Sequence, residues 1–334
     1  MKNGNADLLK KIEDFLSSFS YSEEVKTLRD LLDNIKQTKL NILVVGATGV
    51  GKSSTVNAVF KIQGVSENKD VAEIGKSAKP QTQEITAYEL KNTIIWDTPG
   101  LGDSSENDRL FSKMIMDKLK EKNDKGEAVI DLVLCLLDAS SRDLGTTYTL
   151  LTNHIIPFFK SSEVNDTDRI IIALNKIDKI NCDGEWDYEN NRPDDELMET
   201  IDMNKKELED RLYSETGIKF DLLYFTAGRE NIKKPEKTVQ PYNISKLLYF
   251  MVNKLKDKKK RVVISRDVNQ KKENYKNDDG RLDYNRSTNE AVEESLFDII
   301  WSGAKKAAEV VFSPSNIISA VKAGFGWVLS KFSL

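Results

Sequence analysis

The sequence has little cysteine and histidine and no long apolar run. Its 334 residues include two cysteines and one histidine, and their spacing does not fit a zinc site. Cys135 lies in an apolar, strand-like run, which predicts a buried small hydrophobe. No stretch of 18 apolar residues occurs, and the first residues lack the apolar core of a signal peptide. These absences predict a cytoplasmic protein.

A large excess of one charge is also missing. The net charge is −4, from 50 basic and 54 acidic residues, which provides no global field for holding nucleic acid. There is no basic stripe with interleaved aromatic residues and no G-x-x-G region of the KH type. A nucleic-acid partner is therefore not expected.

Apolar patterning divides the chain into four parts. Residues 1–37 have helical spacing, with a capping box at Ser20 and Glu23. Residues 38–256 alternate short continuous apolar runs with helical stretches. Residues 257–292 are polar and predict a linker, and residues 293–334 predict amphipathic helices. The expected fold is α/β, with a mostly parallel six-stranded sheet flanked by helices and a helical addition formed by the terminal helices.

Six apolar runs in the central part predict the strands, and ligands of such sheets bind at the carboxyl ends of the strands. The predicted strands are 40–45, 86–90, 92–97, 129–138, 169–175 and 220–226, and the predicted helices are 51–60, 106–122, 146–159, 195–216 and 242–256. Candidate site residues are therefore sought where each run ends.

A phosphate-binding pattern follows the first run. Residues 46–54, GATGVGKSS, match G-x-x-x-x-G-K-[ST] between a predicted strand and a predicted helix. Backbone amides of such a loop converge on phosphate oxygens, assisted by the helix dipole. Lys52 would neutralise the β- and γ-phosphates, and the Ser53 hydroxyl would ligate Mg²⁺. The residues predicted to bind nucleotide here are Ala47, Thr48, Gly49, Val50, Gly51, Lys52, Ser53 and Ser54.

The third run ends in the sequence Asp97-Thr-Pro-Gly100. Asp97 can hold Mg²⁺ through water, and the Gly100 amide can sense the γ-phosphate because glycine permits close approach. In isolation such a sequence is more often an ordinary turn. Its position about fifty residues behind the phosphate-binding pattern favours the functional interpretation.

The fifth and sixth runs end in residues that would select the base. Asp178, in Asn175-Lys176-Ile177-Asp178, can accept hydrogen bonds from N1–H and the 2-amino group of guanine. Adenine would leave this carboxylate unpaired. Asn175 could bond the N7 side of the purine and tie back to the phosphate-binding loop, while the Lys176 stem could lie along the base. In Thr226, Ala227 and Gly228, a backbone amide could meet the guanine O6. The predicted ligands are GTP and GDP with Mg²⁺.

GATGVGKSS, DTPG, NKID and TAG, in this order and spacing, resemble the TRAFAC-class GTP-binding domain. The short strands and DTPG resemble its Era-like branch, the 50S ribosome-binding GTPase type. The resemblance covers roughly residues 38–256 and implies a P-loop G domain that hydrolyses GTP. It implies catalytic roles for Lys52 and Gly100 and for a switch-I threonine that completes the Mg²⁺ site. P-x-T before a strand favours Thr82, and Thr86 is the alternative.

Two positions depart from related enzymes. Leu101 stands where a glutamine orients the attacking water, which predicts slow turnover unless another molecule completes the site. Gly49 stands where an asparagine binds K⁺, so K⁺ activation is not expected. The G-x-T-G-x-G-K-S form resembles septins, chloroplast import GTPases and immunity-related GTPases, which implies a GTP-dependent homodimer. Arg142 is the candidate group in trans, and a solvated loop arginine is the alternative.

The terminal helices leave two interpretations open. Residues 293–334, including a helix predicted at 315–334, either pack on the N-terminal helices or bind a membrane surface as a peripheral element. The basic cluster of residues 254–261 could meet anionic lipid or be a solvated helix end. The predicted function is a GTP-hydrolysing switch; a ribosome or RNA assembly factor and a GTP-binding scaffold with negligible turnover are the alternatives.

Overall fold

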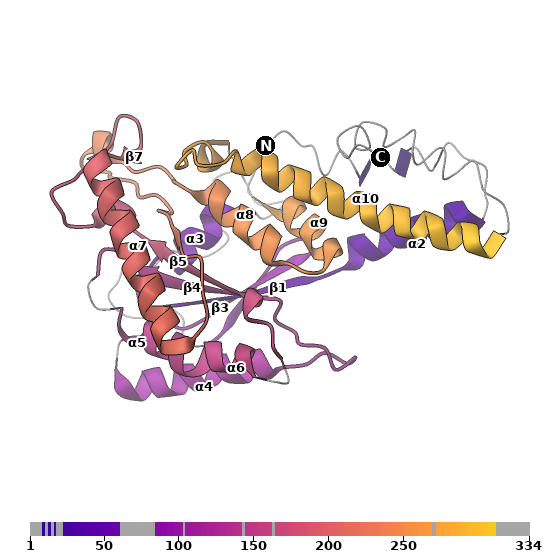
Figure 1. Ribbon diagram of the computed structural model, residues 1–334, viewed down its shortest axis with the longest axis horizontal. Helices are drawn as coiled ribbons and strands as arrows, with labels where there is room; N and C mark the ends of the chain where they lie inside the picture. Colours follow the sequence, from indigo (N-terminus) through magenta and orange to yellow (C-terminus); the bar gives the residue numbers. More distant parts are fainter. Residues whose placement is uncertain are drawn as a thin grey trace.

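A six-stranded sheet lies at the centre of the computed structural model (Figure 1). The structure describes residues 9–10, 13–14, 17, 23–60, 84–102, 104–141, 144–161, 164–268 and 272–311. The strands are β1 (Leu40–Gly46), β2 (Thr86–Glu89), β3 (Thr93–Asp97), β4 (Leu132–Asp138), β5 (Ile170–Asn175) and β8 (Leu223–Tyr224). Their order is β2-β3-β1-β4-β5-β8, in which β2 is antiparallel to β3 and all other pairs are parallel. The predicted fold class is confirmed.

The central strands are apolar on both faces because helices cover both. Ile42 and Val44 of β1 point into one core, and Leu43 and Val45 into the other. The first core is closed by α3 (Lys52–Val59), α8 (Ile244–Lys254) and α9 (Lys258–Asp267). The second is closed by α4 (Ser105–Lys120), α5 (Gly145–Leu150), a π-helical turn (Leu151–Ile155), α6 (Ile156–Lys160) and α7 (Asp195–Thr216). This double cover explains why the strands are continuous apolar runs.

A helical addition extends the first core. Helix α10 (Tyr284–Val311) runs along α8 and α9 and reaches α2 (Glu23–Gln37) (Figure 1). Leu296 and Ile300 of α10 are buried in the same core as Leu28 of α2. A Cβ at Gly303 would lie 2.0 Å from Leu31 Cδ1, so the two helices touch closely there. The described part of α10 is therefore packed on the N-terminal helix, and residues 312–334 lie outside the described residues.

The prediction of a polar linker over residues 257–292 is wrong for most of that segment. It contains α9, a 3₁₀ turn (Lys272–Tyr275) and the start of α10. Val262, Val263 and Ile264 are buried in the first core. The polarity of the segment was misleading because several of its polar groups bond inside the protein. Asp267, for example, accepts hydrogen bonds from the backbone amides next to the β2–β3 turn.

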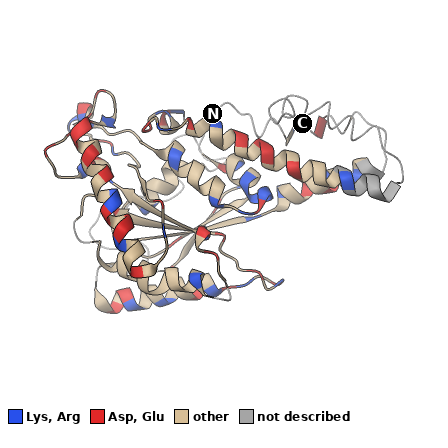
Figure 2. Ribbon diagram, in the orientation of Figure 1, with Lys and Arg blue, Asp and Glu red and all other residues tan. Residues whose placement is uncertain are grey.

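The basic cluster of residues 254–261 is paired within the chain. The charged residues are distributed over both helices and strand ends (Figure 2). Lys254 pairs with Asp168 at 3.1 Å, Lys256 with Asp166 at 2.6 Å, Lys258 with Asp298 at 2.5 Å, and Lys260 with Asp131. Exposed pairs of this kind are individually weak. Together they hold the α8–α9 connection to the amino ends of β4 and β5 and to α10.

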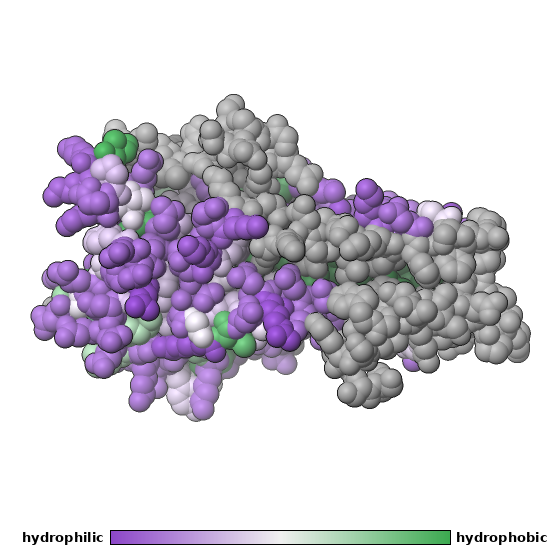
Figure 3. All heavy atoms as spheres, turned by 90° about the horizontal axis from the view of Figure 1, so that it is seen from above, coloured by the Kyte–Doolittle hydropathy of each residue, from purple (hydrophilic) through white to green (hydrophobic). Residues whose placement is uncertain are grey.

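The described surface carries scattered apolar side chains. They are Leu110, Met203, Tyr213, Ile232 and Leu282. The described part of the face in Figure 3 is mostly hydrophilic, with isolated apolar spots. Among the described residues, no helix combines the length and the apolar character needed to cross a bilayer.

Candidate functional site

The phosphate-binding pattern forms a loop between β1 and α3. Gly51 precedes the helix with φ 98°, a left-handed conformation that favours glycine. A Cβ at Gly51 would lie 2.4 Å from Asn175 Nδ2, so a larger residue would collide with the Asn175 side chain. No side chain caps the first turn of α3. An uncapped helix start that follows a glycine-rich loop is the type of element that binds phosphate in other proteins.

Lys52 and Ser53 begin α3. The Lys52 ammonium donates to the carbonyl oxygens of Gly46 at 3.1 Å and Ala47 at 3.3 Å, so its side chain folds back along the loop. Ser53 and Ser54 are half-buried in the first helical turn. A cation held over the loop in this way can neutralise phosphate charge.

Asp97 ends β3 beside this loop. Burial raises the pKa of Asp97 to about 6, against the opposing effects of Lys52 and the Thr98 amide. Its Oδ1 is buried without a hydrogen-bond partner. A buried carboxylate oxygen with unused acceptor capacity fits a hydrated Mg²⁺. Thr86, the alternative switch-I threonine, is the first residue of β2 and lies opposite Asp97 in the β2–β3 register. Thr82 lies outside the described residues.

The Asp97–Gly100 segment is docked on the phosphate-binding loop. A Cβ at Gly100 would lie 2.3 Å from Thr48 Oγ1 and 2.9 Å from Thr48 N, so only glycine fits. The Thr48 amide donates to Leu101 O at 2.9 Å, and the Leu101 amide donates to Gly46 O at 3.3 Å. The Leu101 side chain is 1% exposed and packs in the second core. This position therefore presents neither a polar group nor its apolar side chain to a water molecule in the site.

Asn175 connects three parts of the site. Its amide nitrogen donates to Val50 O at 2.8 Å, which is the expected tie to the phosphate-binding loop. Its Oδ1 accepts from the Lys176 amide at 2.8 Å and from the Ala227 amide at 3.2 Å. Both polar atoms of the side chain therefore bond within the protein, and Asn175 connects the loops around the site. Its contact with the purine stays a prediction.

Asp178 is held from one side and faces a cation on the other. The Thr226 hydroxyl donates to Asp178 Oδ1 at 2.7 Å, and the Gly228 amide donates to the Thr226 hydroxyl at 3.3 Å. Asp178 Oδ2 is buried without a hydrogen-bond partner, and Arg229 Nη2 lies 3.6 Å from it. The amides of Ala227 and Gly228 each have an acceptor within the protein, so a bond to guanine O6 also stays a prediction.

Sequence reasoning missed the side-chain role of Thr226 and the presence of Arg229. Thr226 and Asp178 are 48 positions apart, so no local spacing connects them. The available signal was their common location at the carboxyl ends of adjacent strands, β5 and β8, which pair in parallel.

Lys176 pairs with Asp138, which sequence reasoning placed only in the loop that carries Arg142. The Lys176 ammonium lies 2.5 Å from Asp138 Oδ2, and Lys176 has a left-handed backbone with φ 67°. Burial raises the pKa of Asp138, but the bonds from Lys176 and Ser140 outweigh it and hold the pKa below its ordinary value. Asp138 lies opposite Asn175 in the β4–β5 register. Because Lys176 directly follows Asn175, its ammonium group lies close to the Asp138 carboxylate.

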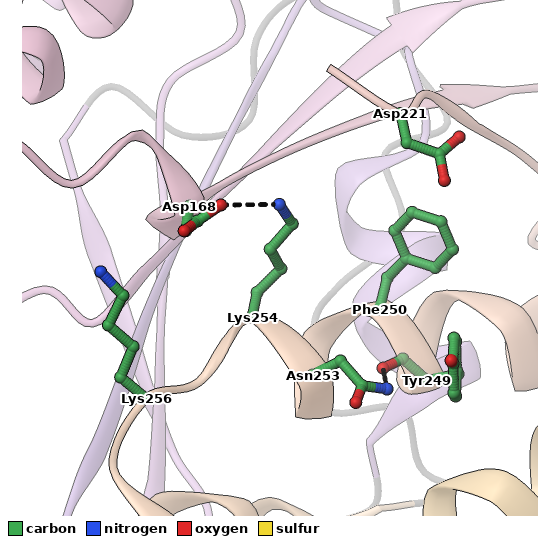
Figure 4. A pocket seen from close by; sticks show the side chains of 7 residues that line it. All are labelled: Asp168, Asp221, Tyr249, Phe250, Asn253, Lys254 and Lys256. Carbon is green, nitrogen blue, oxygen red and sulfur yellow. Dashed lines mark hydrogen bonds and ion pairs between the residues drawn. The ribbon is translucent and has the colours of Figure 1, made fainter. Parts of the chain in front are cut away.

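Among the residues that the structure describes, two of the hollows border the sheet. One of about 940 Å³ adjoins the carboxyl ends of β4 and β5, lined by Asp138–Ser141 and by Thr200, Asn204, Glu207 and Arg211 of α7. Arg142 itself lies outside the described residues. The other, of about 350 Å³, is shown in Figure 4, where Lys254 pairs with Asp168 and the Phe250 ring points toward Asp221. Asp168 precedes β5 and Asp221 precedes β8, so this hollow lies at the amino ends of these strands. The candidate site lies at the opposite, carboxyl ends.

Comparisons with known proteins agree with this geometry. Residues 5–118 match the family described as Interferon-inducible GTPase (IIGP). Translocase of chloroplast 108 of Physcomitrium patens is 39% identical over 113 residues, which are 33% of this chain and 11% of that protein. Immunity-related GTPase family M protein 2 of Mus musculus is 30% identical over 112 residues, 32% of this chain and 27% of that protein.

A bacterial protein matches over a longer segment. The probable GTP-binding protein EngB of Mycoplasmoides gallisepticum is 27% identical over 172 residues, 48% of this chain and 84% of that protein. This chain spans about a tenth of the length of the chloroplast translocases that it matches. The fold, the motif geometry and these similarities support a P-loop GTPase domain of the TRAFAC type. The Era-like branch stays a prediction.

Proposed function

We propose that this chain is a GTP-binding molecular switch that hydrolyses GTP slowly with Mg²⁺ and is activated by a second copy of itself or by a partner. The observation that carries the proposal is the position of Asn175. Its side chain joins the phosphate-binding loop at Val50 to the loop at Ala227. Residues suited to phosphate and residues suited to guanine are thereby held as one unit.

Selection of the base would depend on Asp178. Thr226 orients its carboxylate by bonding Oδ1, and Oδ2 has no hydrogen-bond partner. The N1–H and the 2-amino group of guanine would supply two donors to this carboxylate. Adenine has no such pair of donors, and a buried carboxylate left unpaired is costly. Guanine nucleotides are therefore the expected ligands.

Replacement of Asp178 by Asn tests this role. Xanthine carries a carbonyl at position 2, to which an asparagine amide can donate. Asp178→Asn is expected to weaken GDP binding by about 100-fold and to strengthen binding of xanthosine diphosphate, because each unmatched buried group costs about 1–3 kcal/mol. Binding of fluorescent GDP, xanthosine diphosphate and ADP would be compared by titration. Equal affinity of the unaltered protein for GDP and ADP would contradict guanine selection.

The phosphates and Mg²⁺ would be held around Lys52. Lys52 would contact the β- and γ-phosphates, Ser53 and Thr82 would ligate the metal, and Asp97 would hold it through water. The Gly100 amide would face the γ-phosphate. Lys52→Ala is expected to reduce nucleotide affinity by at least tenfold while leaving the fold intact, because Lys52 is half-buried and donates hydrogen bonds to carbonyl oxygens of the loop.

Slow turnover follows from Leu101. Its side chain is buried in the second core, so a group that positions the attacking water would come from another molecule. An arginine supplied in trans can raise the rate about 10³–10⁵-fold. We propose a GTP-dependent homodimer in which Arg142 has this role.

Phosphate release measured at increasing protein concentration tests activation. Specific activity is expected to rise with concentration, and Arg142→Ala is expected to abolish the rise. Arg286→Ala is the matched control, because Arg286 lies on α10 and its side chain pairs with Glu290 of the same helix at 2.9 Å. A rate that stays near zero at all concentrations would instead indicate a GTP-binding scaffold.

We also propose peripheral membrane association in the cytoplasm through residues beyond the described end of α10. Leu296 and Ile300 are buried, so removal of residues 293–334 would expose the core and confuse the result. A chain ending at Val311 keeps these contacts. Flotation with anionic vesicles should be lost in the shortened chain and retained in the full chain with GTP. Equal flotation of both chains would contradict the proposal.

A further inference from the structure

Arg229 lies directly against the carboxylate that is proposed to select guanine. Its Nη2 is 3.6 Å from Asp178 Oδ2. The Asp178 side chain is 2% exposed, whereas that of Arg229 is 39% exposed. A purine edge therefore cannot reach Asp178 while the carboxylate is covered to this degree. A covering side chain has to move first, and Arg229 has an open side toward solvent into which it can move.

The backbone of Arg229 is fixed, so only its side chain can leave. The Arg229 amide donates to Val239 O at 2.7 Å, and the Val239 amide donates to Arg229 O at 2.9 Å. A second pair of backbone hydrogen bonds joins Thr226 and Tyr242. By contrast, Arg229 Nε is buried without a hydrogen-bond partner. The backbone of Arg229 is thus fixed by hydrogen bonds, whereas its guanidinium is held at Asp178 mainly by charge.

The guanidinium has the same donor pattern as the edge of guanine that Asp178 would read. In guanine, N1–H and the 2-amino group are attached to one carbon, and in arginine two N–H groups are also attached to one carbon. Both present parallel donors to a carboxylate. Thr226 already occupies Oδ1, which leaves Oδ2 as the principal point for which the two groups would compete.

We propose that Arg229 is a specificity-determining residue that competes with guanine for Asp178 and swings toward solvent when the base binds. This inference rests on the proposed function, since it needs guanine at Asp178. Binding of GDP then includes the cost of separating the ion pair, which lowers affinity and speeds release. A base without two adjacent donors cannot replace the guanidinium and leaves Asp178 paired with Arg229.

Arg229→Ala tests the competition. GDP is expected to bind about two- to fivefold more tightly and to dissociate more slowly by a similar factor, as expected for loss of a partly exposed ion pair. The variant keeps the backbone bonds to Val239. Arg192→Ala is the matched control, because Arg192 lies in the hairpin of β6 (Trp186–Asp187) and β7 (Arg192–Pro193) and pairs with Asp187 at 3.9 Å. It should leave GDP affinity unchanged.

A double variant separates competition from a general structural effect. In the Asp178→Asn variant, the side chain at this position carries no charge that could attract Arg229. Adding Arg229→Ala to Asp178→Asn should therefore leave the affinity for xanthosine diphosphate unchanged, whereas loosening of the loop would change it in both backgrounds.

The outcomes distinguish this inference from the proposed function. Equal binding of GDP and ADP by the unaltered protein overturns guanine selection, and the inference with it. If the unaltered protein prefers GDP, and Arg229→Ala weakens GDP binding or leaves it unchanged, the inference alone is overturned. Tighter GDP binding in the variant, absent in the double variant with xanthosine diphosphate, supports it.

Discussion

The side-chain amide of Asn175 donates to the carbonyl oxygen of Val50 across 2.8 Å. This single bond links the end of β5 to the phosphate-binding loop after β1, two strands away in the sheet. Gly51 makes room for it, since a Cβ there would lie 2.4 Å from the same nitrogen. The geometry of the loop and that of the segment 175–178 therefore depend on each other.

Asn175→Ala is expected to damage stability and binding together. It removes the partners of Val50 O and of the Lys176 and Ala227 amides. Buried groups left without partners cost about 1–3 kcal/mol each, so unfolding should become easier by about 2–4 kcal/mol. Chemical denaturation and GDP titration measure the two effects.

The control for this change is Asn253→Ala. Asn253 is exposed, and its amide donates to Tyr249 O within the same helix. It should alter neither stability nor GDP affinity by a measurable amount. A fully stable Asn175→Ala protein with unchanged GDP affinity would show that Asn175 does not join the two loops.

Asp138→Asn is expected to lower stability at neutral pH but not in strong acid. The bonds from Lys176 and Ser140 hold the pKa of Asp138 below its ordinary value despite burial. A lowered folded-state pKa contributes stability that is present above the unfolded pKa and lost as pH falls through the folded pKa. Because the pair is partly solvated, a loss of about 0.5–1 kcal/mol is expected at pH 7.

Urea denaturation of both proteins at pH 7 and at about pH 3 measures this difference. The free energies of unfolding should differ at pH 7, and the difference should narrow as the pH falls toward the folded-state pKa of Asp138, which lies below its ordinary value. A difference that stays constant between the two pH values would assign the effect to lost packing rather than to charge.

Leu101→Gln is expected to destabilise the protein without raising turnover. The Leu101 side chain is buried among Phe111, Ile115 and other residues of the second core. A glutamine amide would be buried there, at a cost of about 1–3 kcal/mol. Thermal unfolding and single-turnover phosphate release measure the two effects. Faster hydrolysis in this variant would mean that residue 101 faces the attacking water.

Asp267→Ala is expected to loosen the β2–β3 turn. The Asp267 carboxylate accepts from the Asn92 amide at 2.9 Å and the Thr93 amide at 2.7 Å. Its removal leaves two buried amides unsatisfied and should cost about 2–4 kcal/mol in unfolding free energy. Asp267→Asn retains a carbonyl acceptor and should cost less. Hydrogen exchange of the two amides should increase in the alanine variant, and unchanged protection would contradict the assignment.

Local sequence patterns were sufficient to predict the sheet and the order of the site motifs. Strands buried on both faces are continuous apolar runs, so β1, β4 and β5 were readable from local composition. The phosphate-binding loop was equally readable, because its glycines, Lys52 and Ser53 are contiguous. Contiguous residues are restricted by local backbone geometry, which a single sequence displays directly.

Contacts between residues far apart in the chain could not be predicted in this way. Asp178 with Arg229 and Thr226, Lys176 with Asp138, and Asp267 with the turn at Asn92 join residues on different elements. No local pattern encodes such pairs, because burial of the surrounding apolar surface determines them. The segment 257–292 shows the same limit, since its polar residues are satisfied by partners far away in the chain and so resemble a solvated linker.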